Sequence, residues 1–173
     1  NDDYQYADDA SGNIPSNLQL TLNVASSSSD TTPPNFESLS LSQNSVDVSS
    51  ADQTFTVTAR ITDNLSGISD SGSNPGYANV ELVSPSGEQS VYAEFREYNR
   101  ISGDPTDGIY ESEVTLPAFS EAGEWTVSYI GTQDNVGNDD YQYADDASGN
   151  IPSNLQLTLN VASNSSDTTP PVF

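Results

Sequence analysis

The sequence contains a long and nearly perfect duplication. Residues 1–36 recur as residues 138–173, and the two copies differ only at Ser27 against Asn164 and at Asn35 against Val172. Identity this high over an offset of 137 residues predicts a tandem array of near-identical units. The chain then holds one complete unit and parts of its two neighbours.

Two serine-rich stretches, SSSSDTTPP and SNSSDTTPP, mark the boundaries between the predicted units. Serine residues followed by a proline pair are typical of a short linker that is flexible at first and then stiff. Residues 1–29 are therefore predicted to be the C-terminal tail, with the last strand, of a preceding repeat. Residues 30–166 form one full repeat, and residues 167–173 begin the next.

The side-chain inventory excludes several kinds of chemistry. The sequence has no Cys, His, Met or Lys, so thiol, imidazole and lysine catalysis and His/Cys zinc sites are excluded. A net charge of −23, from 26 acidic residues against three arginines, repels phosphate backbones and anionic lipids. No apolar run approaches the roughly 20 residues of a membrane span. We expect no enzyme activity, no nucleic-acid binding and no membrane insertion.

Apolar and polar residues alternate along most of the central unit, as in half-buried β-strands. The pattern is clear from Phe55 to Ile61 and clearest from Leu155 to Val161, and Trp125 falls on an apolar, core-facing position. The predicted strands are 36–48, 53–62, 78–84, 90–98, 108–116, 123–132 and 154–162. No segment has an apolar helical period. The sequence therefore predicts an all-β fold, an antiparallel β-sandwich of about seven strands.

Four stretches within residues 30–162 resemble a bacterial immunoglobulin-like tandem repeat: DTTPP, TDNLSGI, GIYESEVTLP and EAGEWTVSYIGTQDNVGN. Such repeats occur in giant surface adhesins and secreted fibrous proteins, including those of biofilms. The resemblance implies an Ig-like sandwich, an extracellular or cell-surface location in a bacterium, and stiffening by calcium. The sequence departs from the pattern by a long acidic insert, residues 138–150, before the final strand.

In an Ig-like sandwich, the strands 53–62 and 123–132 end at the pole where the first strand begins. Asp30, Asp63 and the acidic segment 134–140 should therefore converge there. Crowded carboxylates repel one another without a cation, and oxygen ligands in flexible glycine-containing loops suit Ca²⁺ better than Mg²⁺. The candidate metal ligands are Asp30, Asp63, Asp134, Asn135, Asn138, Asp139, Asp140, Asp145, Asp146 and Asp167. Several of these residues could instead only stabilise turns or lie in solvated loops.

These observations together predict a structural repeat of an extracellular, calcium-stabilised adhesin stalk or fibre, in which neighbouring identical repeats chain head to tail. We expect the last strand within residues 1–29 to pair with a preceding unit, because a lone amphipathic strand is not stable. One alternative is a carbohydrate- or cell-binding module that uses a tyrosine-bearing loop at 141–143. Another is a non-catalytic accessory repeat of a secreted hydrolase.

Overall fold

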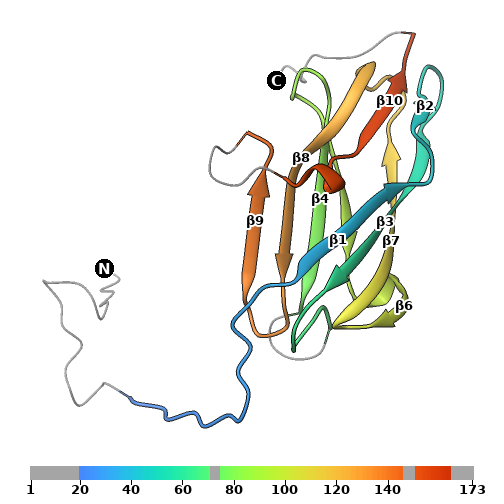
Figure 1. Cartoon of the computed structure of the whole chain (residues 1–173). Coiled ribbons are helices and arrows are strands. Elements are labelled where there is room, and N and C mark those ends of the chain that lie inside the picture. Colours follow the sequence, from blue (N-terminus) through green and yellow to red (C-terminus); the bar gives the residue numbers. More distant parts are fainter. Residues whose placement is uncertain (1–19, 71–74, 146–150, 165–173) are drawn as a thin grey trace, which may run out of the picture.

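A computed structural model describes residues 20–70, 75–145 and 151–164, and these residues form a two-layered β-sandwich (Figure 1). The prediction of an all-β sandwich is confirmed. The strands are β1 (Asn35–Leu41), β2 (Ser45–Asp47), β3 (Gln53–Thr62), β4 (Tyr77–Val83), β5 (Ser90–Phe95), β6 (Arg100–Asp104), β7 (Asp107–Leu116), β8 (Gly123–Gln133), β9 (Asp139–Tyr143) and β10 (Thr158–Ala162). Two short 3-10 helices, η2 (Glu97–Asn99) and η3 (Ser153–Leu155), lie between strands. No helix among the described residues is long and apolar enough to span a membrane.

Among the described residues the strands form two sheets, and almost all neighbours are antiparallel. The first sheet has the order β1-β3-β7-β6, and the second has the order β2-β10-β8-β4-β5. Strand β9 extends the second sheet by pairing with β8 beside the end of β10, so β9 and β10 share one edge of β8. The β2–β10 pair is parallel.

The core fills the space between the sheets with the inward half of each alternating strand. Strand β3 contributes Phe55 to Ile61 at every second position, and β10 contributes Leu159 and Val161. Trp125 is buried as predicted, and its indole N–H donates a hydrogen bond of 2.9 Å to the carbonyl of Glu121. Because the Trp125 N–H has this hydrogen-bond partner, burial of the side chain leaves no unsatisfied donor.

The structure differs from the predicted strands in five respects. The predicted strand 36–48 is two strands, β1 and β2, which belong to different sheets. The predicted strand 90–98 ends at Phe95, and it is followed by strand β6, which was not predicted and which is the fourth strand of the first sheet. The acidic insert contains strand β9, and the last strand begins at Thr158 instead of residue 154.

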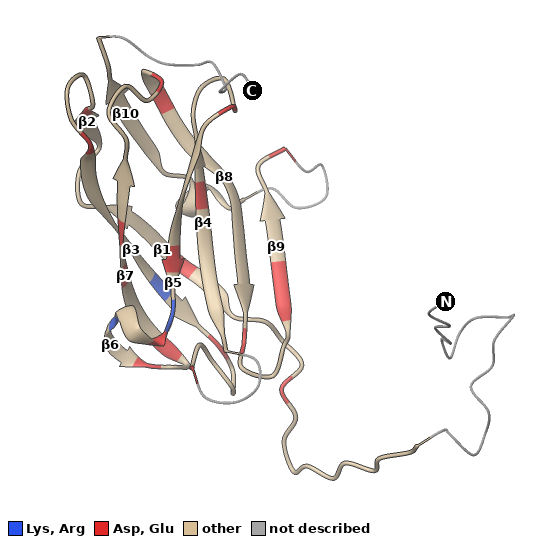
Figure 2. Ribbon diagram, turned by 180° about the vertical axis from the view of Figure 1, so that it is seen from behind, with Lys and Arg blue, Asp and Glu red and all other residues tan. Residues whose placement is uncertain are grey.

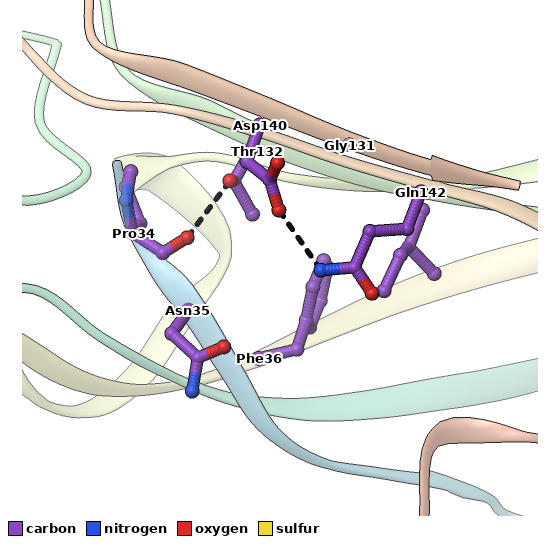
Figure 3. Close-up of a pocket in the computed structure, with 8 residues that line it drawn as sticks. Pro34, Asn35, Phe36, Gly131, Thr132, Asp140 and Gln142 are labelled. Atoms are coloured by element: carbon purple, nitrogen blue, oxygen red, sulfur yellow. Dashed lines mark hydrogen bonds between the residues drawn. The ribbon is translucent and has the colours of Figure 1, made fainter. Parts of the chain in front are cut away.

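The N-terminal copy of the last strand was expected to pair with a preceding unit, and this expectation stays a prediction. Residues 20–29 lie outside any strand and are exposed. Residues 1–19 and 167–173, to which the domain prediction also refers, lie outside the described residues. The chain reaches the sandwich at Pro34, whose carbonyl accepts a hydrogen bond of 2.8 Å from the Thr132 hydroxyl on β8 (Figure 3).

Candidate metal centre

Three aspartates meet at the pole of the sandwich where β1 begins and β3 and β8 end. Asp30 precedes β1, Asp63 directly follows β3, and Asp134 directly follows β8. One carboxylate oxygen from each lies within 4.8 Å of one from both of the others. The predicted convergence of Asp30, Asp63 and Asp134 is therefore present in the folded chain, and we call these three residues the carboxylate cluster.

Asp134 is the buried member of the cluster, and its side chain is 0% exposed. Its Oδ1 accepts hydrogen bonds from the backbone N–H groups of Val136, Gly137 and Asn138 at 2.9, 2.7 and 2.8 Å. Its Oδ2 accepts a further bond of 2.6 Å from the Asn138 side-chain amide. Gly137 has a φ of 94°, which lets the backbone turn its N–H groups toward one oxygen. These bonds stabilise a buried carboxylate.

Asp63 presents one satisfied and one unsatisfied oxygen. Its Oδ1 accepts hydrogen bonds from the N–H groups of Leu65 and Gly67 at 2.7 and 3.0 Å. Its Oδ2 is buried and has no hydrogen-bond partner. Since a buried carboxylate oxygen without a partner is costly, this atom is the one that most needs a ligand from outside the protein.

Asp30 ties the linker to the loop that follows β3. Its Oδ2 accepts a hydrogen bond of 2.8 Å from the Ser66 N–H, and its Oδ1 accepts one of 3.3 Å from the Thr32 N–H. The Asn64 side-chain amide also donates to the Thr32 hydroxyl at 2.6 Å. Burial tends to raise the pKa of Asp30, but the hydrogen bonds from Ser66 and Thr32 outweigh it and lower that pKa. The cluster thus includes an ionised group that belongs to the linker.

Among the residues that the structure describes, no basic side chain forms an ion pair with the carboxylate cluster. The chain has three basic side chains, and each forms an ion pair elsewhere. Those pairs are Arg60–Asp107, Arg96–Glu94 and Arg100–Glu97. Figure 2 shows acidic residues over both sheets and the basic ones only around β3, β5 and β6. Oxygen ligands that carry uncompensated negative charge are the donor set of a hard divalent cation.

The other predicted ligands take several positions. Asn135 lies in the same turn as Asp134, and its backbone N–H donates to the Gly67 carbonyl at 3.1 Å. Asn138 is a hydrogen-bond donor to Asp134, as described above, and Asp145 is exposed just after β9. Asp146 and Asp167 lie outside the described residues.

Asp139 and Asp140 were expected in the loop after β8, and that placement is wrong. They begin strand β9, where they pair with Gln133 and Thr132, and both are exposed. Asp140 faces a small pocket between β1 and β9, where its Oδ2 accepts a hydrogen bond of 2.9 Å from Gln142 (Figure 3). Neither residue joins the carboxylate cluster, because the backbone pairs with β8 immediately after Asn138.

The contacts of Gly67, which hold the carboxylate cluster in place, were not predicted from the sequence. Gly67 has a φ of 66°, and a Cβ added there would lie 2.2 Å from the Pro105 carbonyl oxygen. The Gly67 N–H and carbonyl contact Asp63 and Asn135, so this glycine joins the loops after β3 and β8. The D-x-x-x-G spacing from Asp63 to Gly67 is a signal of such a turn.

Comparison with known proteins gives a family and a distant structural similarity. A search of curated proteins finds no match. A solved bacterial adhesin from Mobiluncus mulieris, containing intramolecular disulfide, isopeptide and ester bond cross-links, is similar with a TM-score of 0.33 and 10% identity. The similarity covers 75% of this chain and 57% of the adhesin chain. Residues 29–170 match a family described as a domain of unknown function, DUF7035, and because this match spans most of the sequence, the chain belongs to that family.

Proposed function

We propose that this chain is a non-catalytic structural module of an extracellular, calcium-stabilised adhesin stalk or fibre, which chains head to tail with identical modules. The observation that carries the proposal is the buried Asp63 Oδ2, which has no hydrogen-bond partner and belongs to a cluster of three aspartates. A divalent cation bound by Asp30, Asp63 and Asp134 would satisfy that oxygen and offset the charge of all three.

The donor set favours calcium over magnesium. Calcium accepts six to eight oxygen ligands in flexible geometry, whereas magnesium requires a near-ideal octahedron and keeps several waters. The three carboxylates come from three separate loops, and two of them also accept backbone hydrogen bonds in glycine-containing turns. Carboxylates that are each fixed by the hydrogen bonds of their own loop are not expected to form the near-ideal octahedron that magnesium requires.

The position of Asp30 supports a role in the joint between modules. Asp30 lies in the linker, between the serine stretch at 26–29 and the pair Pro33-Pro34. A cation shared by Asp30, Asp63 and Asp134 would hold the linker against the ends of β3 and β8. The duplicated sequence repeats this linker after β10, so the same joint would recur between successive modules.

A thermal melt of the full chain tests the proposal. A ligand that binds only the folded state stabilises it by RT ln(1+[L]/Kd), about 2.7 kcal/mol at a hundredfold excess over Kd. The Tm should rise with millimolar Ca²⁺, fall on addition of a chelator, and respond weakly to Mg²⁺. An identical melt with calcium and with chelator, on protein shown to be metal-free by elemental analysis, would refute the proposal.

A tyrosine cluster on the second sheet favours a second candidate, recognition of glycans. The rings of Tyr129 and Tyr141 stack at 6.2 Å between centroids, and Tyr143 lies 5.0 Å from Tyr129. The Tyr77 and Tyr141 hydroxyls are 3.3 Å apart. Tyr141 and Tyr143 belong to β9 and not to a loop, so the cluster has a sheet beneath it. Exposed aromatic faces beside hydroxyls are suited to the mixed apolar and polar surface of sugars.

Binding to insoluble polysaccharide distinguishes this second candidate. If the tyrosine cluster binds glycan, the full chain should co-sediment with cellulose or chitin, and Tyr143→Ala should abolish co-sedimentation. Tyr98→Ala is the matched control, because Tyr98 is exposed but lies at η2, outside the cluster. Failure of the wild-type chain to co-sediment with either polymer argues against recognition of these two glycans.

A further inference from the structure

Residues 20–25 have the same sequence as residues 157–162, which include strand β10, yet they lie in a different environment. Leu22 and Val24 are 85% and 79% exposed. Their counterparts in the second copy, Leu159 and Val161, are 0% and 5% exposed. Because the two segments are identical in sequence, the difference comes from their surroundings. The chain therefore carries a second β10 sequence that has no place in this sandwich.

The structure shows which position in a sandwich this sequence fits. Strand β10 lies between β8 and β2, with Leu159 opposite Trp125 and Val161 opposite Gly123. The Asn160 N–H donates to the Asn44 carbonyl at 2.8 Å, and the Val48 N–H donates to the Ala162 carbonyl at 2.9 Å. We call this position the β10 seat. Residues 21–25 present the same backbone and the same side chains to such a seat.

The N-terminal copy cannot reach the seat of its own sandwich while Asp30 stays in the carboxylate cluster. With Val24 placed opposite Gly123, the six residues to Asp30 would span at most about 22 Å. Asp134, next to Asp30, lies at the other end of β8 from Gly123. At the rise of a β-strand this separation is roughly 33 Å, allowing for the irregular pairing within β8. Within its own chain, the segment could therefore fill that position only if Asp30 left the carboxylate cluster.

We propose that residues 20–25 form the β10 strand of a second copy of this unit, seated between its β2 and its β8. Residues 26–34 then join the far pole of that copy to the carboxylate cluster of this one. The proposal rests on the head-to-tail chaining proposed above and deepens it. The partner that it names is a second copy whose strands β1–β8 are folded and whose β10 seat is empty. In the structure described here, residues 158–162 fill the chain's own seat.

The duplication allows a matched experiment on the full chain. Leu159→Asp with Val161→Asp disables the strand that fills each molecule's own seat and leaves the N-terminal copy intact. This variant should remain rich in β-structure by circular dichroism and form oligomers whose mass by light scattering rises with concentration. Open-ended growth is expected, because a head-to-tail contact does not close on itself unless its rotation forms a ring.

Two control variants complete the design. The same changes in the first copy, Leu22→Asp with Val24→Asp, should leave a monomer with the wild-type Tm. All four changes together should abolish both the β-structure and the oligomers.

Two results would overturn the inference. One is a folded monomer from the Leu159/Val161 variant, which would mean that the N-terminal copy reaches its own seat. The other is the same mass and the same spectrum for the double variant in β10 and the quadruple variant. Either result leaves calcium-dependent melting of the wild-type chain untouched, so the two proposals fail separately.

Discussion

Asp63 and Asp134 follow the last residues of β3 and β8, two strands of different sheets, and their carboxylate oxygens lie within 4.8 Å of each other. Backbone N–H groups fix both side chains, so neither can move away without breaking its own turn. The closure of the sandwich at this pole is therefore coupled to the charge of two aspartates. Like charges held this close oppose closure, and a bound cation would reverse the effect.

Replacing Asp63 by Asn should separate the effect of charge from that of hydrogen bonding. The amide oxygen can still accept the bonds from Leu65 and Gly67, while one negative charge is removed. We expect Asp63→Asn to melt at or above the wild-type Tm in chelator and well below it in calcium. Asp52→Asn is the control, because Asp52 accepts one backbone hydrogen bond, from Ala118, away from the cluster. Equal losses in calcium for both variants would contradict the assignment.

Because Pro105 lies so close to Gly67, alanine should destabilise the fold far more at Gly67 than at Gly87. Gly67 and Gly87 both have positive φ, 66° and 78°, so alanine strains either backbone by about 1 kcal/mol or more. A Cβ at Gly67 also meets the Pro105 carbonyl at 2.2 Å, whereas nothing lies within 4 Å of one at Gly87. Denaturant unfolding should show a clearly larger loss for Gly67→Ala. Similar losses would mean that the loop relaxes around Pro105.

The two copies of one leucine should respond very differently to truncation. Leu159→Ala removes a buried side chain and should lower the free energy of unfolding by about 2–5 kcal/mol. Leu22→Ala changes the identical position of the exposed copy and should cost less than about 0.5 kcal/mol in the monomer. Urea unfolding measures both. A large loss for Leu22→Ala would show that the first copy is packed in solution.

Alkaline titration should report the packing of the tyrosine cluster. Burial, with a contribution from Tyr143, raises the pKa of Tyr129 from 10.0 to about 12. Between these pH values the folded chain keeps a proton that the unfolded chain has released, so the free energy of unfolding falls as pH rises. Tyr129→Phe should remove that part of the pH dependence, while Tyr98→Phe should retain it. Absorbance at 295 nm and urea unfolding across pH 9–12 test this.

Much of the sandwich could be predicted from alternation alone, since β3 and β10 each expose polar residues on one face and bury apolar residues on the other. The sequence also contains a signal for the break between β1 and β2. The apolar positions change from odd at Leu39 and Leu41 to even at Val46 and Val48. Such a change of phase requires a break, because side chains in one strand alternate strictly between its faces.

Strands β6 and β9 could not be predicted in this way. Neither buries an apolar side chain, and both are held by backbone pairing with a longer neighbour, β7 or β8. The same reason explains the misplacement of Asp139 and Asp140. By contrast, Asp30, Asp63 and Asp134 could be brought together from sequence, because each flanks a strand whose direction the sandwich topology fixes.

Calorimetric titration of Ca²⁺ into metal-free full chain tests the carboxylate cluster most directly. Wild-type protein should bind calcium at a site that Asp63→Asn eliminates and Asp52→Asn leaves unchanged in heat and stoichiometry. Calcium binding that is the same in all three proteins, or no binding at all, would contradict a calcium site at Asp30, Asp63 and Asp134.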